Sequence, residues 1–244
     1  MSEPLPATSS GEVEMSTPET ITNIFFEPGR TFEALRTRPR FLVATIVVLV
    51  LTIALTLLVN FRIDMGAYIR EKMDRSPNAA QQSEQQKEMG VKIGKIIALV
   101  GIPVAVPIIL AAGAALYLLG ALAFGGSLSY KKALTVWAYS WIPPSVFATF
   151  VGVLVLFLKS ADSIDPEKML VTNPGAFMSA ETSSPVLVAF MSQFDVLRFY
   201  GMFLAALGLR KVGKMSSGGA WGVVITLWVL GLVLRVGQAA LFGR

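Results

Sequence analysis

The chain contains no cysteine and no histidine. Without them it cannot form a disulfide bond, a thiolate or histidine metal site, or a Ser-His-Asp triad. Charged residues are also scarce, at 15% of the chain, compared with about 25% in typical soluble domains. Walker loops, GxSxG sequences and Gly-rich dinucleotide turns are missing too. We therefore expect a protein that is not an enzyme and that holds neither a metal nor a cofactor.

Apolar residues, by contrast, make up 54% of the 244 residues, and the mean hydropathy is +0.63. A soluble domain of this length cannot bury so much apolar surface, which indicates an integral membrane protein with the lipid bilayer as its partner. The net charge is +5, but much of the Lys and Arg lies beside apolar runs, where it orients a membrane protein. Nucleic-acid binding would need a basic face on a soluble module, and no such module is visible.

Five apolar blocks predict five transmembrane helices, because a span needs about 20 mostly apolar residues. They cover residues 41–60, 96–124, 133–158, 185–209 and 220–242. The first three meet the length easily, whereas the last two contain charged residues that a bundle must accommodate. The predicted fold class is an all-α integral membrane protein, a bundle of five transmembrane helices preceded by a short amphipathic helix.

Residues 1–20 are polar and rich in Glu, Ser, Thr and Pro. Because they contain no apolar block to bury, we expect a disordered cytosolic tail, followed by one membrane domain over residues 21–244.

A short amphipathic helix is predicted directly before the first span. Pro28 is suited to the first helical position, and Phe32 and Leu35 then share one side. Phe25 is placed to pack just before the helix, and Arg36 belongs to its cationic flank. Such a helix can lie in the headgroup region. The alternative interpretation is a basic stop beside the first span, which sets orientation only.

Four arginines precede the first span, and the short loops at 125–132 and 210–219 carry Lys and Arg without acids. In a five-span protein these segments share one face, and the positive-inside rule places that face in the cytosol. We therefore expect a cytosolic N-terminus and an external C-terminus, in the plasma (inner) membrane if the source is prokaryotic. The loop at 60–95 holds seven basic residues and argues against this orientation. We expect two helical extensions there, and irregular structure at 159–184.

Asp195, Arg198 and Arg235 are charged residues inside apolar blocks. A charge at the centre of a bilayer costs about 2.5–3.5 kcal/mol on insertion scales, so each is expected to face protein and to be paired. Asp195 is predicted to pair either with Arg198, three residues along its own helix, or with Arg235 on the next span. The pair is either structural or part of a buried polar site for a lipid headgroup, an ion or a proton.

Prolines interrupt two of the predicted spans, at Pro103 and Pro107 and at Pro143 and Pro144. Each proline removes one helical hydrogen bond and frees a carbonyl group. The more ordinary interpretation is a set of helix kinks; the alternative is an ion site lined by free carbonyls. The hydroxyls of Tyr139 and Ser140 are placed to hydrogen-bond with the carbonyl groups freed near the kink of the third span.

The order of these segments resembles the Ypt/Rab-interacting-protein (Yip) domain family, in its prokaryotic form. The resemblance rests on FFEPGRTFEALRTRP before the first span, GGSLSYKKALTVWAYSWIPP at the third and FDVLRFYGMFLAALGLRKVGKMSSGGAW at the fourth. It implies a five-helix membrane domain with a cytosolic N-terminus. In eukaryotes it also implies a link to prenylated Rab-type GTPases, but no residue here identifies a GTPase-binding site.

Two hypotheses about function follow. The first is a non-enzymatic scaffold or adaptor in membrane organisation or trafficking-like processes, which meets protein partners on the cytosolic face. The second is a transporter or lipid-handling protein that uses a buried polar site at Asp195, Arg198 and Arg235. The second span is rich in small residues, which suits packing within the chain or in a homo-oligomer.

Overall fold

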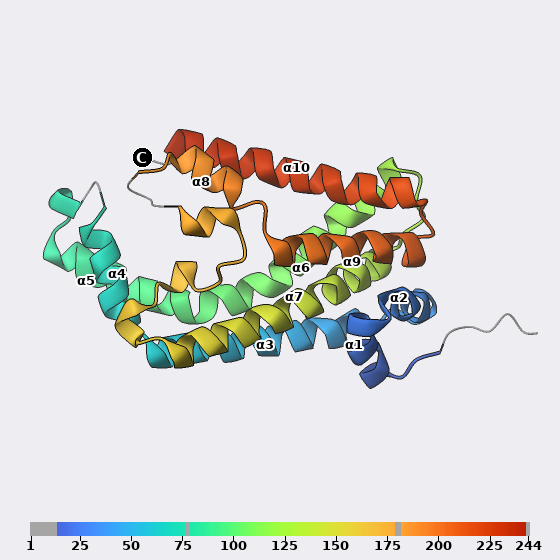
Figure 1. Ribbon diagram of the computed structural model, residues 1–244, viewed down its shortest axis with the longest axis horizontal. Coiled ribbons are helices and arrows are strands. Elements are labelled where there is room, and N and C mark those ends of the chain that lie inside the picture. Colours follow the sequence, from blue (N-terminus) through green and yellow to red (C-terminus); the bar gives the residue numbers. More distant parts are fainter. Residues whose placement is uncertain (1–13, 77–78, 179–181, 243–244) are drawn as a thin grey trace, which may run out of the picture.

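The computed structural model describes residues 14–76, 79–178 and 182–242, and every regular element within them is helical. Within these ranges, four helices are long and apolar enough to cross a membrane, and they run side by side along the length of the molecule (Figure 1). This confirms the predicted all-α membrane fold. The four helices are α3 (Phe41–Arg62), α6 (Ile102–Ala123), α7 (Tyr130–Leu158) and α10 (Ser217–Phe242).

The expected fourth span is two helices rather than one. α8 (Pro185–Met191) and α9 (Val196–Val212) meet at an angle of 47° across a short break. The bundle therefore has four candidate spans among the described residues, or five if this bent pair counts as one. Asp195 is the N-cap of α9, with an extended backbone that cannot continue α8.

The two ends of the bundle differ in construction (Figure 1). At the end called here the N-terminal end, α1 (Thr17–Phe26) and α2 (Pro28–Thr37) lie beside the turns that follow α6 and α9. At the opposite end, called the far end, α4 (Met65–Asp74) and α5 (Glu84–Ile96) lie together with the loop after α7 and the last turns of α10.

The expectation of disorder through residue 20 is wrong for residues 17–20, which form the first turn of α1. Ser16 accepts the backbone N–H of Glu19, and the Glu19 carboxylate accepts the backbone N–H of Ser16 at 2.6 Å. This capping box satisfies two amide groups that a helix start leaves free. Residues 1–13 of the predicted tail lie outside the described residues.

α2 begins at Pro28, as the sequence predicted, but its apolar face packs on protein rather than on lipid. Phe32 and Leu35 are fully buried against α7 and α9. Gly208 of α9 makes room for this contact, since a Cβ there would lie 2.9 Å from the Phe32 ring and 2.7 Å from Val136. α2 is therefore a docked helix.

Small residues of α6 permit close packing inside the chain. A Cβ at Gly113 would lie 2.5 Å from the Trp137 ring of α7, and one at Gly120 would lie 2.6 Å from Val223 of α10. These two glycines therefore allow close helix packing within the chain, which is one of the two predicted roles of the small residues.

The segment between α3 and α6 forms a helical hairpin of α4 and α5, joined to α6 through a π-helical turn, η2 (Ile97–Gly101). The loop after α7 contains three short 3₁₀ turns, η3 (Ala161–Ser163), η4 (Pro166–Lys168) and η5 (Pro174–Phe177). The Tyr68 hydroxyl donates to Asp165 at 3.0 Å, so the loop is tied to α4. Burial and the neighbouring carboxylates raise the pKa of Tyr68, which keeps its hydroxyl a donor.

Candidate functional site

Asp195 forms neither of the predicted ion pairs. Its carboxylate accepts the backbone N–H of Arg198 at 3.0 Å and the Thr172 hydroxyl, with a longer contact from the Asn173 amide at 3.5 Å. Among the described residues, no salt bridge joins it to Arg198 or Arg235. The carboxylate serves instead as a helix cap and a loop anchor.

Gln193 holds the break between α8 and α9 in place. Its side chain is almost fully buried, and its carbonyl oxygen accepts a hydrogen bond from the Arg198 guanidinium. Its backbone carbonyl accepts the indole N–H of Trp228, on α10, at 3.3 Å. From the other side, η5 packs so closely that a Cβ at Gly175 would overlap the Ser192 hydroxyl. The break is thus a fixed structure supported from three sides.

A cavity of about 590 Å³ lies beside this break, between α8, α9 and α10. Arg198 reaches it from the first turn of α9, and Arg235 from two turns before the end of α10. At 1.5 Å per residue, Arg235 lies about 10 Å along the helix from that end. The residues that supply polar groups to its wall are Ser183, Ser192, Gln193, Arg198, Arg235 and Gln238.

The charge of this cavity is positive, because both charged residues in its wall are arginines. Within the described ranges, no carboxylate lies within salt-bridge distance of Arg198 or Arg235. No hydrogen bond between described residues uses the amide NH₂ of Gln193 either, so this donor is also available. Planar guanidinium groups bind phosphate and carboxylate through paired N–H donors. The arrangement suits an anionic group better than a cation or a proton.

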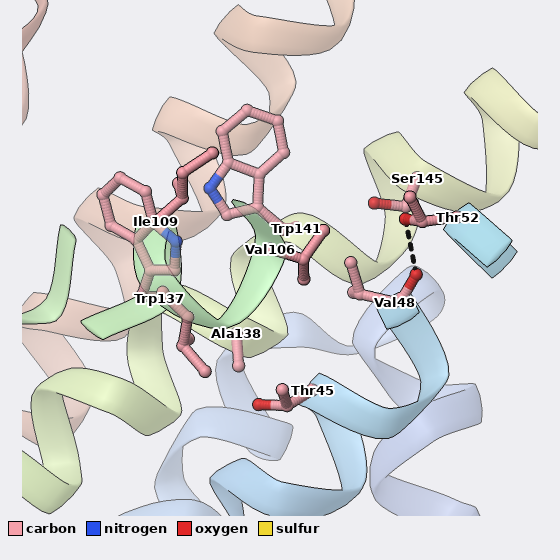
Figure 2. Close-up of a pocket in the computed structure, with 10 residues that line it drawn as sticks. Thr45, Val48, Thr52, Val106, Ile109, Trp137, Ala138, Trp141 and Ser145 are labelled. Carbon is pink, nitrogen blue, oxygen red and sulfur yellow. Dashed lines mark hydrogen bonds between the residues drawn. The ribbon is translucent and has the colours of Figure 1, made fainter. Parts of the chain in front are cut away.

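A second cavity, of about 250 Å³, lies between α3, α6 and α7 (Figure 2). Trp137 and Trp141 form one side of it, with their ring centroids 6.2 Å apart. The hydroxyls of Thr45 and Thr52 each donate to a carbonyl of their own helix, at 2.8 and 2.7 Å. The wall of this cavity is mostly apolar and contains no charged residue, so it suits an apolar ligand better than a charged one.

The prolines of the third span do not interrupt its helix. α7 runs without a break through Pro143 and Pro144, which are both buried. The nearby hydroxyls do not reach the freed carbonyls: Ser140 donates to Val136 O at 2.7 Å, and the Tyr139 hydroxyl meets Thr20 at 3.0 Å. The first contact lies within α7 and the second joins α7 to α1, so neither hydroxyl lines an ion site at the prolines.

In the second span, Pro103 lies in the first turn of α6, directly after the π-turn, and Pro107 lies inside the helix. The missing N–H of Pro103 thus falls at a change of helix type, whereas that of Pro107 falls within α6. At the N-terminal end, Phe25 and Arg36 are each half-buried.

Sequence reasoning missed three residues that fix the break or complete the cavity, namely Thr172, Gln193 and Gln238. Gln193 and Gln238 carried a usable signal, because polar side chains in apolar blocks are expensive and mark functional or packing sites. Thr172 lies in an irregular loop and carried none.

Comparisons with known proteins give one family and no individual relative. The sequence model of the Yip1 domain matches residues 22–237, which is most of the chain. No curated protein and no solved structure matches it.

Proposed function

The chain belongs to the Yip1 domain family, and from that premise we propose that it is a lipid-handling membrane protein. The ligand is the anionic headgroup of a phospholipid, held in the cavity between α8, α9 and α10. The observation that carries the proposal is the convergence of Arg198 and Arg235 on one cavity in which neither meets a carboxylate among the described residues.

The energetics of membrane insertion support an anionic ligand. A cation within an apolar span is costly unless an anion compensates it or the side chain reaches the interface. Two cations beside one cavity also repel each other, and a bound phosphate removes that repulsion while accepting several N–H donors. Arg198 is oriented for this by its bond to Gln193, which in turn is fixed to α10.

The size and position of the cavity support a lipid rather than a small ion. Its volume of about 590 Å³ falls within the roughly 300–1,000 Å³ typical of small-molecule sites. Its walls come from α8 and α10, which expose Leu187, Phe190, Val233 and Leu234 on their outer surfaces. Acyl chains pack well against such residues, so a headgroup in the cavity keeps its tails in an apolar environment.

Lipid binding can be tested by native mass spectrometry of protein released from nanodiscs that contain phosphatidylglycerol and phosphatidylcholine. We expect Arg235→Gln and Arg198→Gln to lose the retained phosphatidylglycerol. The matched control is Arg210→Gln, an exposed arginine of α9 at the N-terminal end, which is expected to retain it. Equal retention by all four proteins would contradict the proposal. Competition by inorganic phosphate, without competition by added lipid, would identify a free anion as the ligand.

Transport of the bound lipid is a separate property with a separate test. Purified protein in liposomes with fluorescent phosphatidylglycerol in one leaflet is expected to speed its appearance in the other leaflet, and Arg235→Gln to abolish the increase. No increase above empty liposomes would limit the function to binding.

A scaffold role is the second candidate, favoured by the docking of α1 and α2. Glu33 pairs with Lys211 of α9, and Thr20 meets Tyr139 of α7, so the two helices form a fixed platform. Partners captured with the intact protein and with Phe32→Ala, which undocks α2, would test it. Identical partners would argue against the platform.

We also propose that the N-terminal end faces the cytosol, because Lys131 and Lys214 lie there with the other basic short loops. Single cysteines introduced at residues 131, 214 and 163 are free of competing native thiols. A membrane-impermeant maleimide is expected to label only residue 163 from outside. Labelling of residue 163 only from the cytosolic side would reverse the topology.

A further inference from the structure

α5 carries an apolar stripe that no described part of the chain covers. Met89, Ile93 and Ile96 recur at intervals of four and three residues and are 55%, 50% and 61% exposed, and the next residue, Ile97 of η2, is 60% exposed. This spacing places them on one side of the helix. In water, such a stripe would be an unfavourable surface for a helix that is otherwise polar.

The stripe cannot turn inwards, because the opposite side of α5 is used to pack on α4. A Cβ at Gly90 would lie 2.6 Å from Met73, and one at Gly94 would lie 2.9 Å from Ile69. Glycine at these two positions leaves room for the Met73 and Ile69 side chains.

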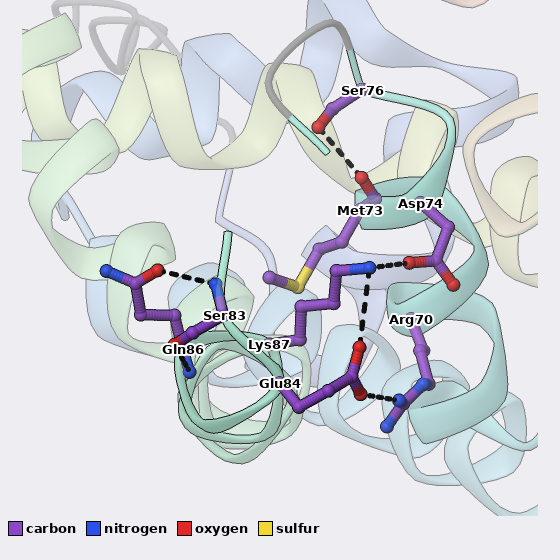
Figure 3. Close-up of polar contacts among 8 residues, drawn as sticks. All are labelled: Arg70, Met73, Asp74, Ser76, Ser83, Glu84, Gln86 and Lys87. Carbon is purple, nitrogen blue, oxygen red and sulfur yellow. Dashed lines mark hydrogen bonds and ion pairs between the residues drawn. The ribbon is translucent and has the colours of Figure 1, made fainter. Parts of the chain in front are cut away.

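Polar contacts fix the same rotation of α5 (Figure 3). Lys87 pairs with Asp74 at 2.7 Å, and Arg70 pairs with Glu84. Ser83 and Gln86 form a capping box at the start of α5. The hairpin is therefore held by glycines and ion pairs, while the apolar side chains of α5 point away from it.

The stripe continues directly into the exposed surface of the α6 span. Ile97, Val100, Val104 and Ile108 follow at intervals of three and four residues and are 60%, 46%, 57% and 63% exposed. On α6 this line faces lipid, because α6 is a candidate membrane span. The apolar surface of α5 is thus an extension of a lipid-facing surface.

We propose that α5 lies on the bilayer surface at the far end of the bundle, with its stripe in the boundary between headgroups and acyl chains. Lys92 and Lys95 are exposed on α5 and supply positive charge for anionic headgroups, as in interfacial helices. The π-turn η2 provides the change of helix geometry between the span and the surface helix. This surface is independent of the cavity at Arg198 and Arg235.

The test uses full-length protein in liposomes, with single cysteines that carry the environment-sensitive fluorophore NBD. Met89→Cys, Ile93→Cys and Ile96→Cys report on the stripe. The matched control is Glu88→Cys, an exposed polar position of the same helix. We expect blue-shifted emission and quenching by spin-labelled lipids at the three stripe positions, and quenching by aqueous iodide at residue 88.

Equal iodide quenching at all four positions would overturn the proposal. A blue shift without quenching by spin-labelled lipids, which disappears as the protein is diluted into more lipid, would instead mean that a second copy of the chain covers the stripe. The double substitution Lys92→Gln/Lys95→Gln tests how much the two lysine charges contribute to membrane contact. It is expected to weaken quenching by spin-labelled lipids in phosphatidylglycerol liposomes and to leave it unchanged in phosphatidylcholine liposomes.

Discussion

The two ends of the bundle use their polar groups in different ways. At the N-terminal end, Lys211 meets Glu33, Tyr139 meets Thr20, and the Arg40 guanidinium donates to the Thr17 hydroxyl at 3.0 Å. At the far end, ion pairs also hold α4 to α5, but beside the break between α8 and α9 the carboxylate of Asp195 is used by a helix cap, and the nearby arginines face a cavity instead.

This difference separates groups that hold the fold from groups that are available for a ligand. Paired and buried groups contribute to stability, whereas charged groups aimed at a cavity contribute little to it and are found at binding sites. Substitutions at the N-terminal end should therefore lower stability, and substitution of Arg235 should lower binding with little effect on stability.

The largest effect is expected from Phe32→Ala. Phe32 is fully buried between α2, α7 and α9, and removing a buried aromatic side chain typically costs about 3–5 kcal/mol. Phe26→Ala is the matched control, since Phe26 is 79% exposed. Thermal melting in detergent, together with proteolysis of the α1–α2 segment, measures both variants. Equal losses for the two would mean that α2 is not docked as described.

Asp195→Ala is expected to have the next largest effect. It removes the cap of α9 and the acceptor for Thr172, and the loss of a cap costs about 0.5–2 kcal/mol. Asp195→Asn keeps an acceptor oxygen and should cost less. The fall in melting temperature of the double variant Asp195→Ala/Arg235→Gln should equal the sum of the falls of the two single variants. A smaller fall than that sum would mean that Asp195 does form an ion pair with Arg235.

Much of the fold could be predicted because long apolar runs have few alternatives to crossing a membrane. The break at residues 192–195 could not be predicted, since the sequence stays largely apolar from Val186 to Leu204. What decides it is tertiary: Gly175 lets η5 approach Ser192, and Thr172 holds the cap residue. The docking of α2 was similarly hidden, because an amphipathic pattern does not say whether lipid or protein covers it.

The candidate site could be predicted in part. The rule that charges inside a span mark a site selected Arg198 and Arg235, and both line one cavity. The same rule assigned Asp195 to the wrong partners, because it treats a carboxylate as a charge to be neutralised. The backbone N–H groups at a helix start also need acceptors, and the Asp195 carboxylate accepts one of them instead of pairing with an arginine.

Tyr139→Phe tests the polar contacts of the N-terminal end one at a time. It removes the hydroxyl that meets Thr20 in a fully buried position. A hydrogen bond of this kind contributes about 0.5–1.5 kcal/mol, so a modest fall in the melting temperature is expected. Thr20 keeps its bond to Thr17 O at 2.7 Å, which limits the loss. A melting temperature equal to that of the parent would mean that water replaces the contact at no cost.

The smallest effects on stability are expected from replacing single cations. We compare one substitution at each end of the bundle. Lys211→Gln breaks a partly exposed pair with Glu33 and should cost at most about 1 kcal/mol, less at high salt. Arg235→Gln removes a cation that meets no carboxylate among the described residues, so stability should change by no more than about 0.5 kcal/mol. Melting curves in neutral detergent at low and high salt measure both.

With phosphatidylglycerol added, the parent and Lys211→Gln should gain stability through ligand binding, and Arg235→Gln should not. Equal gains for all three would place the lipid elsewhere on the protein, since only a ligand bound at Arg235 makes the gain depend on that side chain.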